Sequence, residues 1–383
     1  MTYAPDPEAF GPTADVPAWV VNRRDLGWRC DPPSAAVADF HRTLPGYAPT
    51  PLVDLPTLAT ELGVGRIFAK DESARLGLPA FKGLGASWAV HRMLQSSPVG
   101  DVLTIVTATD GNHGRAVARF ARLLGHRAAI LIPKGVHPAA IQAIVDEGAT
   151  VTVVDASYDD AVVAATAAAK APGHVLVQDT AWPGYEEIPG WIVDGYDTLF
   201  TEIDHQLHAA QLAHPDLVLV PAGVGSLLQA ALTHYRSAAY AGSDGADTAV
   251  VSVEPTAAAC IAASVTARRP VTVDTSPTAM AGLNCGTPSS TAWPFIVNGL
   301  DAAATVSETD DIKAAHDLAT LGVAAGPCGA APLAAARTVL TGPGSSRRRT
   351  QLRLGPDATV VLLVTEGSDS NPVPPLASPT VPG

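Results

Sequence analysis

An apolar run, a glycine-rich loop and an alanine-rich run follow one another in residues 103–124, which read LTIVTATDGNHGRAVARFARLL. The first run has the length of a strand and the last has the length of a helix, so the segment predicts a strand that leads through a loop into a helix. The same order recurs in residues 128–147, 151–169 and 217–235. Alternation of this kind is typical of α/β proteins with parallel sheets.

The predicted strands are apolar without polar alternation, as in residues 217–220, LVLV, and residues 359–364, TVVLLV. Such strands are expected where helices cover both faces of a parallel sheet, so we predict a doubly wound architecture. The chain of 383 residues also exceeds the size that one hydrophobic core usually serves. We therefore expect two subdomains, or one large α/β body with an insertion.

The net charge and the hydropathy of the sequence argue against nucleic acid and membranes as partners. The formal net charge of −13 would repel phosphate backbones and anionic lipid surfaces, and the longest basic run is the three arginines at 347–349. No stretch reaches the roughly 20 uninterrupted apolar residues of a membrane-spanning helix. We expect neither nucleic acid nor a membrane as a partner.

The cysteines and the N-terminal sequence indicate the cellular compartment that we expect. The four cysteines (Cys30, Cys260, Cys285 and Cys328) are scattered, with no CxxC pair and no histidine at metal-ligand spacing. Residues 1–19 are polar and rich in proline, unlike a signal peptide. We expect no metal site and a cytoplasmic location.

A lysine stands at the predicted start of a helix in residues 78–87, LPAFKGLGAS. Lys82 lies there among apolar and glycine residues, which predicts a partly desolvated side chain. Burial favours the neutral amine, which is the form that attacks an aldehyde to make a Schiff base. An exposed lysine at a helix start is the alternative that this segment alone leaves open.

Residues 220–227, VPAGVGSL, join a predicted strand to a predicted helix. Successive backbone amides at such a junction can converge on an anion, and glycine permits its close approach. A full dinucleotide fingerprint is absent, because Gln229 and Ala230 stand where further glycine would fall. A single phosphate therefore suits this loop better than a pyrophosphate, and a turn that needs glycine only for steric reasons is the alternative.

Polar side chains follow the strand in residues 107–114, TATDGNHG. Loops at the carboxyl edge of an α/β sheet are where such proteins bind ligands. The amides and hydroxyls of this loop could hold a carboxylate, Asn112 could donate to a phenolate oxygen, and Asp110 could take a proton. The alternatives are a helix N-cap for Asp110 and a supporting hydrogen bond for His113.

These three motifs in this order resemble the fold-type II pyridoxal-phosphate enzymes of the tryptophan synthase β-like superfamily. Within that superfamily the sequence is most similar to the diaminopropionate ammonia-lyases, over residues 46–367. The most particular segment is 178–192, QDTAWPGYEEIPGWI, which generic threonine and serine dehydratases lack. Residues 280–286 and 364–367 resemble later motifs of the same family.

The resemblance implies pyridoxal 5′-phosphate as the cofactor, with Lys82 bound to it as a Schiff base. Asn112 would contact the ring oxygen, and Phe81 would pack beside the ring. The phosphate would be bound by the turn of Gly223, Val224, Gly225 and Ser226. Thr365 would place a hydroxyl against the pyridine nitrogen. A neutral hydroxyl leaves that nitrogen unprotonated, so the ring is a weaker electron sink and expulsion of a β-leaving group is favoured.

The resemblance further implies α,β-elimination of 2,3-diaminopropionate to pyruvate and two molecules of ammonia. Lys82 and Asp110 would take the Cα proton from opposite faces, so that the D and L substrates both react. Asp179 would lie near the amino end of the substrate, where a negative charge attracts its extra ammonium group. Thr109 and His113 complete the predicted substrate-binding set.

We expect two doubly wound domains. Residues 1–85 and 184–383 would form a large cofactor-binding domain, and residues 86–183 a small mobile domain. Residues 372–383 are rich in proline and would form a flexible tail. The resemblance implies a homodimer.

One segment departs from the family, because residues 326–330 read GPCGA where the family has a Glu-Ser-Gly stretch. Either the missing carboxylate is dispensable, or the substrate or leaving group differs. β-Elimination or β-replacement on another small amino acid is therefore the alternative function. A non-catalytic protein that binds pyridoxal phosphate is a third hypothesis, which the joint presence of Lys82, Asp110 and Asp179 argues against.

Overall fold

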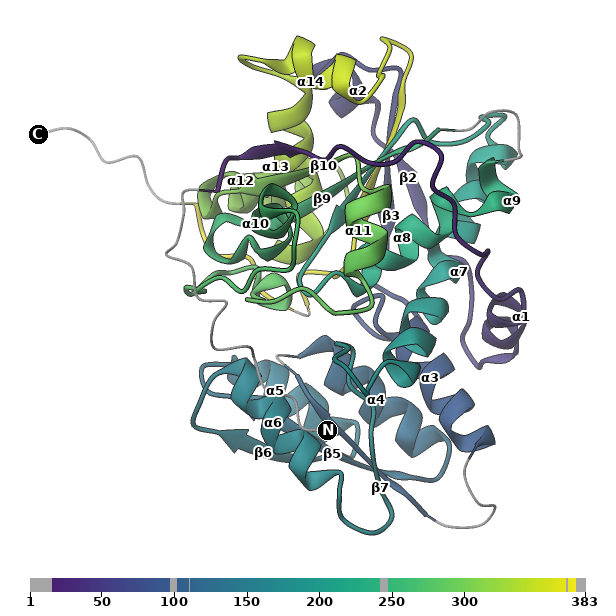
Figure 1. The fold of residues 1–383 in the computed structure, drawn as a ribbon, viewed down its shortest axis with the longest axis vertical. Helices are drawn as coiled ribbons and strands as arrows, with labels where there is room; N and C mark the ends of the chain where they lie inside the picture. The colour runs from purple at the N-terminus through teal and green to yellow at the C-terminus, as the bar shows by residue number, and fades with distance from the viewer. Residues whose placement is uncertain (1–15, 97–101, 110, 242–246, 370, 377–383) are drawn as a thin grey trace, which may run out of the picture.

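Two separate β-sheets organise the chain. The computed structural model describes residues 16–96, 102–109, 111–241, 247–369 and 371–376. Figure 1 shows two bodies, one above the other, each built on one of the sheets. Within the described residues, no helix is both long enough and apolar enough to cross a membrane.

The larger sheet has seven strands in the order β1-β10-β9-β8-β11-β3-β2. The inner strands pair in parallel, whereas the edge strands β1 and β2 pair antiparallel with their neighbours. The strands are β1 (Trp19–Val21), β2 (Leu52–Asp54), β3 (Arg66–Asp71), β8 (Leu217–Pro221), β9 (Ala249–Pro255), β10 (Ala302–Val306) and β11 (Thr359–Val364).

The smaller sheet is inserted in the chain between β3 and β8. It has four strands in the order β6-β5-β4-β7, and all of its pairs are parallel. The strands are β4 (Thr104–Ala108), β5 (Arg127–Pro133), β6 (Thr150–Val154) and β7 (His174–Leu176).

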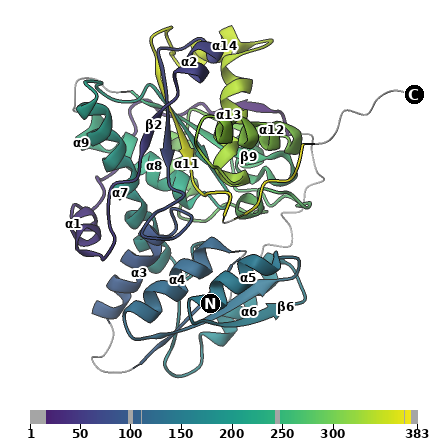
Figure 2. The same cartoon turned by 180° about the vertical axis from the view of Figure 1, so that it is seen from behind.

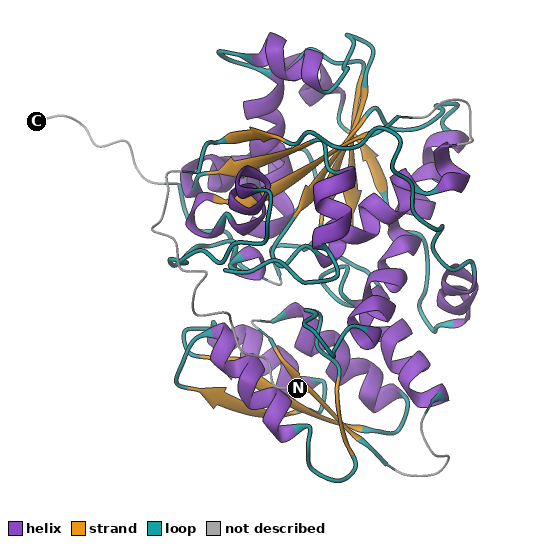
Figure 3. Ribbon diagram, in the orientation of Figure 1, coloured by secondary structure: helices purple, strands orange, loops and turns teal. Residues whose placement is uncertain are grey.

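Helices cover the sheets on both sides, as Figure 3 shows. For the larger sheet, α10 and α11 lie in front in Figure 1, and α12 and α13 lie in front in the opposite view of Figure 2. The helices of the smaller body are α3 (Gly83–Gln95), α4 (Asn112–Leu123), α5 (Pro138–Asp146) and α6 (Tyr158–Ala168). The other helices are α1 (Ala36–Thr43), α2 (Pro56–Leu62), α7 (Glu187–Ala209), α8 (Ser226–Arg236), α9 (Ala238–Ala241), α10 (Cys260–Ala267), α11 (Trp293–Gly299), α12 (Glu308–Thr320), α13 (Pro327–Leu340) and α14 (Ser345–Gln351), with the short 3₁₀ turns η2 (Thr256–Ala258) and η3 (Ala281–Leu283).

Burial explains why the strands are apolar without alternation. Every residue of β8, β9, β10 and β11 is buried, since each of these strands has neighbours on both sides and helices on both faces. Strand β6 is the contrast: it lies at the edge of the smaller sheet, and Val153 is 56% exposed. The predicted α/β fold with mostly parallel sheets is confirmed. The two antiparallel edge strands are a feature that the sequence did not reveal.

Helices α3 and α7 pack against each other where the two bodies meet. Their crossing depends on two glycines, because a Cβ atom at Gly85 would lie 2.5 Å from Cε1 of Tyr196. A Cβ atom at Gly195 would lie 2.7 Å from Cα of Gly85. The close contact brings the side chains of α7 directly against the start of α3.

The partition into domains at residues 85/86 and 183/184 stays a prediction. The described part of the tail, residues 372–376, contacts the larger body, since His316 Nε2 lies 3.1 Å from the Pro374 carbonyl. Directly before the tail, Asn371 Nδ2 donates to the Ala279 carbonyl at 2.7 Å.

Candidate active site

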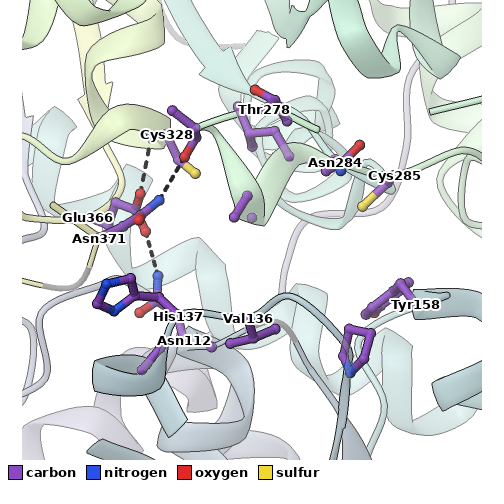
Figure 4. A pocket seen from close by; sticks show the side chains of 18 of the residues that line it. Asn112, Val136, His137, Tyr158, Thr278, Asn284, Cys285, Cys328, Glu366 and Asn371 are labelled. Atoms are coloured by element: carbon purple, nitrogen blue, oxygen red, sulfur yellow. Dashed lines mark hydrogen bonds between the residues drawn. The ribbon is translucent and has the colours of Figure 1, made fainter. Parts of the chain in front are cut away.

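A cavity of about 800 Å³ lies between the two bodies. The carboxyl ends of strands from both sheets open into it, through Pro133 at the end of β5, Pro221 at the end of β8 and Thr365 directly after β11. Figure 4 shows side chains of the smaller body, such as Asn112, facing side chains of the larger body, such as Glu366. This is the edge at which α/β sheets bind ligands.

Lys82 stands immediately before α3 and lines the cavity. Its side chain is 21% exposed, and its Nζ atom lies 2.6 Å from Oδ2 of Asp179. The Nζ atom is also 5.3 Å from the centre of the Phe81 ring. The lysine that the sequence singled out is therefore partly desolvated and held by a carboxylate.

Asp179 follows β7 and is almost completely buried. Burial alone would raise the pKa of its carboxyl group, but the Lys82 ammonium, with help from His113, holds that pKa at about 2. Asp179 therefore carries a full negative charge inside the cavity.

The turn of residues 223–226 lies between β8 and α8. Gly225 has a left-handed backbone with φ of +96°, and a Cβ atom at Gly223 would lie 2.9 Å from Sγ of Cys285. The turn thus requires glycine both for conformation and for space. It leads into the N-terminus of α8, where unpaired backbone amides and the helix dipole favour an anion.

The Thr365 hydroxyl is a second group that a ligand could contact. Its hydroxyl oxygen is buried, and no described atom forms a hydrogen bond with it. A buried polar atom without a partner is costly, so a bound group is expected to supply one. Thr365 and the turn of residues 223–226 both line the cavity, and both suit pyridoxal phosphate, one at the ring nitrogen and the other at the phosphate.

Asn112 is held by a carboxylate from the other body. Its Nδ2 atom donates to Oε2 of Glu366 at 2.6 Å, and the Cys328 amide donates to Oε1 of Glu366 at 3.1 Å. Burial raises the pKa of the Glu366 carboxyl, although these donors and Lys82 oppose the rise. Sequence reasoning missed Glu366, and its place directly after Thr365 was the signal that could have found it.

The divergent segment of residues 326–328 packs directly on this carboxylate. A Cβ atom at Gly326 would lie 3.1 Å from Cγ of Glu366. The segment that lacks the family's acid is thus adjacent to the Glu366 carboxylate.

Thr109 and His113, which the sequence placed in the substrate-binding set, are not among the described residues that line the cavity. The Thr109 hydroxyl accepts hydrogen bonds from the amides of Gly111 and Gly114, so it orders the loop. His113 Nε2 lies 2.9 Å from the Val177 carbonyl, and its Nδ1 lies 3.9 Å from Oδ2 of Asp179. Burial lowers the pKa of the His113 imidazole. Asp110 falls outside the described residues.

Metal ligands do not gather in the described part of the chain: no group of three or more histidine, cysteine or acidic side chains could hold an ion there.

The sequence matches known proteins over most of its length. The model of the pyridoxal-phosphate dependent enzyme family matches residues 43–366. The diaminopropionate ammonia-lyase of Escherichia coli strain K12 is 36% identical over 352 residues, which cover 86% of each chain. The diaminopropionate ammonia-lyase of Salmonella typhimurium strain LT2 is 41% identical over 283 residues, which cover 68% of this chain and 69% of that protein.

Solved structures agree with the sequence matches. The crystal structure of the Escherichia coli enzyme in complex with an aminoacrylate-PLP azomethine reaction intermediate superposes with a TM-score of 0.83 and 34% identity. The superposition covers 92% of this chain and 94% of the other. The chain therefore belongs to the pyridoxal-phosphate dependent enzyme family and, within it, to the diaminopropionate ammonia-lyases.

Proposed function

We propose that this protein is an ammonia-lyase that converts 2,3-diaminopropionate and water into pyruvate and two molecules of ammonia. The observation that carries the proposal is the 2.6 Å contact between the Lys82 amine and the Asp179 carboxylate inside the shared cavity. A lysine there can hold a carbonyl cofactor, and a charged carboxylate beside it can attract a substrate with a second ammonium group.

The described residues suit pyridoxal phosphate at each end of the molecule. The turn of Gly223, Val224, Gly225 and Ser226 would bind the phosphate, and the Thr365 hydroxyl would meet the ring nitrogen. Asn112 would contact the ring oxygen, and Phe81 would pack beside the ring. When bound, the cofactor supplies an electron sink next to the substrate Cα atom.

The chain contributes the proton transfers and the charge complementarity. Lys82 takes the Cα proton from one face, and Asp110 takes it from the other face in the opposite enantiomer. Asp179 faces the substrate ammonium groups. Ammonia then leaves Cβ, and the released 2-aminoacrylate is hydrolysed to pyruvate and the second ammonia.

The first experiment combines an ultraviolet-visible spectrum of the purified holoenzyme with a pyruvate assay after adding D- or L-2,3-diaminopropionate. We expect a cofactor band that shifts on addition, with pyruvate formed from either enantiomer. The Lys82→Ala variant is expected to lose the band and the activity. A holoenzyme without the band, or full activity in Lys82→Ala, would overturn the proposal.

One observation favours a second candidate, β-elimination or β-replacement on another small amino acid. Cys328 of the divergent segment lines the cavity and replaces a family residue there. Rates of ammonia release from diaminopropionate, serine, threonine and an O-activated serine separate the two functions. A preference for diaminopropionate of less than about tenfold would favour the second.

The assembly and the compartment are also proposed. We infer a cytoplasmic homodimer from the family resemblance and from the reducing environment that four scattered cysteines, with no CxxC pair, suggest. Light scattering on the purified holoenzyme tests the dimer.

A further inference from the structure

A fully buried tyrosine on α7 lies against the segment that carries Lys82. Cε1 of Tyr196 would be 2.5 Å from a Cβ atom at Gly85, and its ring centre is 4.8 Å from that of Phe81. Phe81 directly precedes Lys82 and Gly85 follows it by three positions, so the ring packs against the segment on both sides of the lysine. The close approach of α3 and α7 at Gly195 brings the tyrosine against this segment, because it leaves no room for a side chain between the two helices.

The Tyr196 hydroxyl is unusual for a buried polar group. No described residue forms a hydrogen bond with it. The ionisable groups that act on the pKa of the phenol are Lys82 and Asp179. Burial raises the pKa of the phenol, and the Lys82 ammonium opposes the rise. A buried hydroxyl without a hydrogen-bond partner needs an explanation, and a role in positioning Lys82 provides one.

We propose that Tyr196 is a positioning residue for Lys82, whose phenol oxygen accepts a hydrogen bond from the lysine amine when the substrate has displaced that amine from the cofactor. This inference rests on the proposed function only in assigning the cofactor to Lys82. In the structure the amine points to Asp179. During turnover the substrate ammonium competes for that carboxylate, so Lys82 needs a second partner to stay aimed at Cα.

The amine then takes the Cα proton and becomes an ammonium group. A phenol oxygen that accepts a hydrogen bond from the ammonium favours this protonated form. Tyr196 itself neither gains nor loses a proton. Asp179, His113 and Glu366 also act on the Lys82 charge, and they stay unchanged in the variants below.

The chain offers a matched control in Tyr235 on α8. It is also fully buried, and its hydroxyl also lacks a hydrogen-bond partner among the described residues. The groups that act on the Tyr235 phenol are Asp204, Tyr240 and Asp197, and Lys82 is not among them. Tyr196→Phe and Tyr235→Phe therefore remove the same atom from equally buried sites, of which only one faces the lysine.

The test measures how fast each apoprotein captures pyridoxal phosphate as a function of pH, followed by the cofactor absorbance. Capture requires the neutral amine, so its pH midpoint reports the protonation of Lys82. We expect the midpoint for Tyr196→Phe to lie about one pH unit lower than that of the parent, and the midpoint for Tyr235→Phe to stay unchanged. With diaminopropionate, Tyr196→Phe should lower kcat about tenfold at nearly constant KM.

Equal midpoints for both variants would overturn the inference while leaving the proposed function intact. A midpoint that shifts only in Tyr196→Phe, in a protein that forms no pyruvate, would support the inference and overturn the proposed function. Thermal unfolding completes the test, since both variants keep every carbon atom. A Tyr196→Phe protein far less stable than Tyr235→Phe would also overturn the inference, because the hydroxyl would then have a structural role.

Discussion

The Lys82 Nζ atom and the Asp179 carboxylate lie 2.6 Å apart, although 97 positions separate the two residues in the sequence. Lys82 is held at the start of α3, and Asp179 follows the last strand of the smaller sheet. The ion pair therefore links the lysine to the start of the family-specific segment, residues 178–192. Ser226 strengthens this link, since its hydroxyl donates to the Asp179 carbonyl at 2.7 Å.

Removing the Asp179 charge should weaken catalysis on a dibasic substrate. Asp179→Asn keeps the shape but loses the charge-assisted contact, so we expect kcat/KM for diaminopropionate to fall about 10- to 100-fold. Steady-state pyruvate formation measures the loss. Asp39→Asn, which changes a carboxylate that is 75% exposed, is the control and should retain full activity. Equal activity in the two variants would show that the charge has no part in the reaction.

The Thr365 hydroxyl should matter for the cofactor and not for folding. Thr365→Val removes a buried oxygen without a described partner, so the apoprotein should be as stable as the parent or more stable. Its dissociation constant for pyridoxal phosphate should rise about 2- to 10-fold, as measured by fluorescence titration. Thr305 in β10 is also buried without a described partner for its hydroxyl, so Thr305→Val should leave the cofactor affinity unchanged.

Folding stability should fall at alkaline pH through His234. Its ring nitrogens lie 2.8 Å from Asp197 and 2.7 Å from Asp204. Burial would lower the pKa of the imidazole, but these two carboxylates raise it to about 9. Because the folded pKa exceeds the unfolded value of 6.5, the stabilisation is complete below about pH 6.5 and is lost as the pH rises through 9.

A His234→Gln variant tests this dependence. The shift corresponds to at most about 3 kcal/mol of unfolding free energy. Urea unfolding at pH 6 and pH 10 should show a large difference between parent and variant at the lower pH and a small one at the higher. A difference that does not change with pH would contradict a charged histidine.

The α3–α7 crossing should not tolerate a side chain at Gly85. A Cβ atom there would meet Tyr196 Cε1 at 2.5 Å and the Ile192 carbonyl at 2.8 Å. We expect Gly85→Ala to destabilise the fold by about 1–3 kcal/mol through overpacking. Gly190→Ala is the matched control on α7: its Cβ atom would have no neighbour within 4 Å, so this variant should be neutral or slightly stabilising. Chemical denaturation compares the two, and a stable Gly85→Ala protein would show that the helices can separate.

The sequence predicted much of the site, but not how its residues meet. Local patterns singled out Lys82, Asn112 and the turn at residues 223–226, the family resemblance added Thr365, and the structure brings all of them to one cavity. Glu366 was missed because its importance comes from Asn112, 254 positions away in the sequence. Its place directly after Thr365 puts Glu366 near the site, but no local pattern encodes the contact with Asn112. The place of Asp110 stays a prediction.

Local composition was sufficient for the class of fold. Apolar runs of strand length must be covered on both faces, and the alanine-rich runs between them supply the helices, so a doubly wound α/β architecture follows from burial alone. The edge strands, the α3–α7 crossing and the burial of Tyr196, Glu366 and His234 depended on the tertiary structure. These features arise where segments distant in the sequence exclude water from one another. The free energy of such a contact depends on both segments, so neither segment alone predicts it.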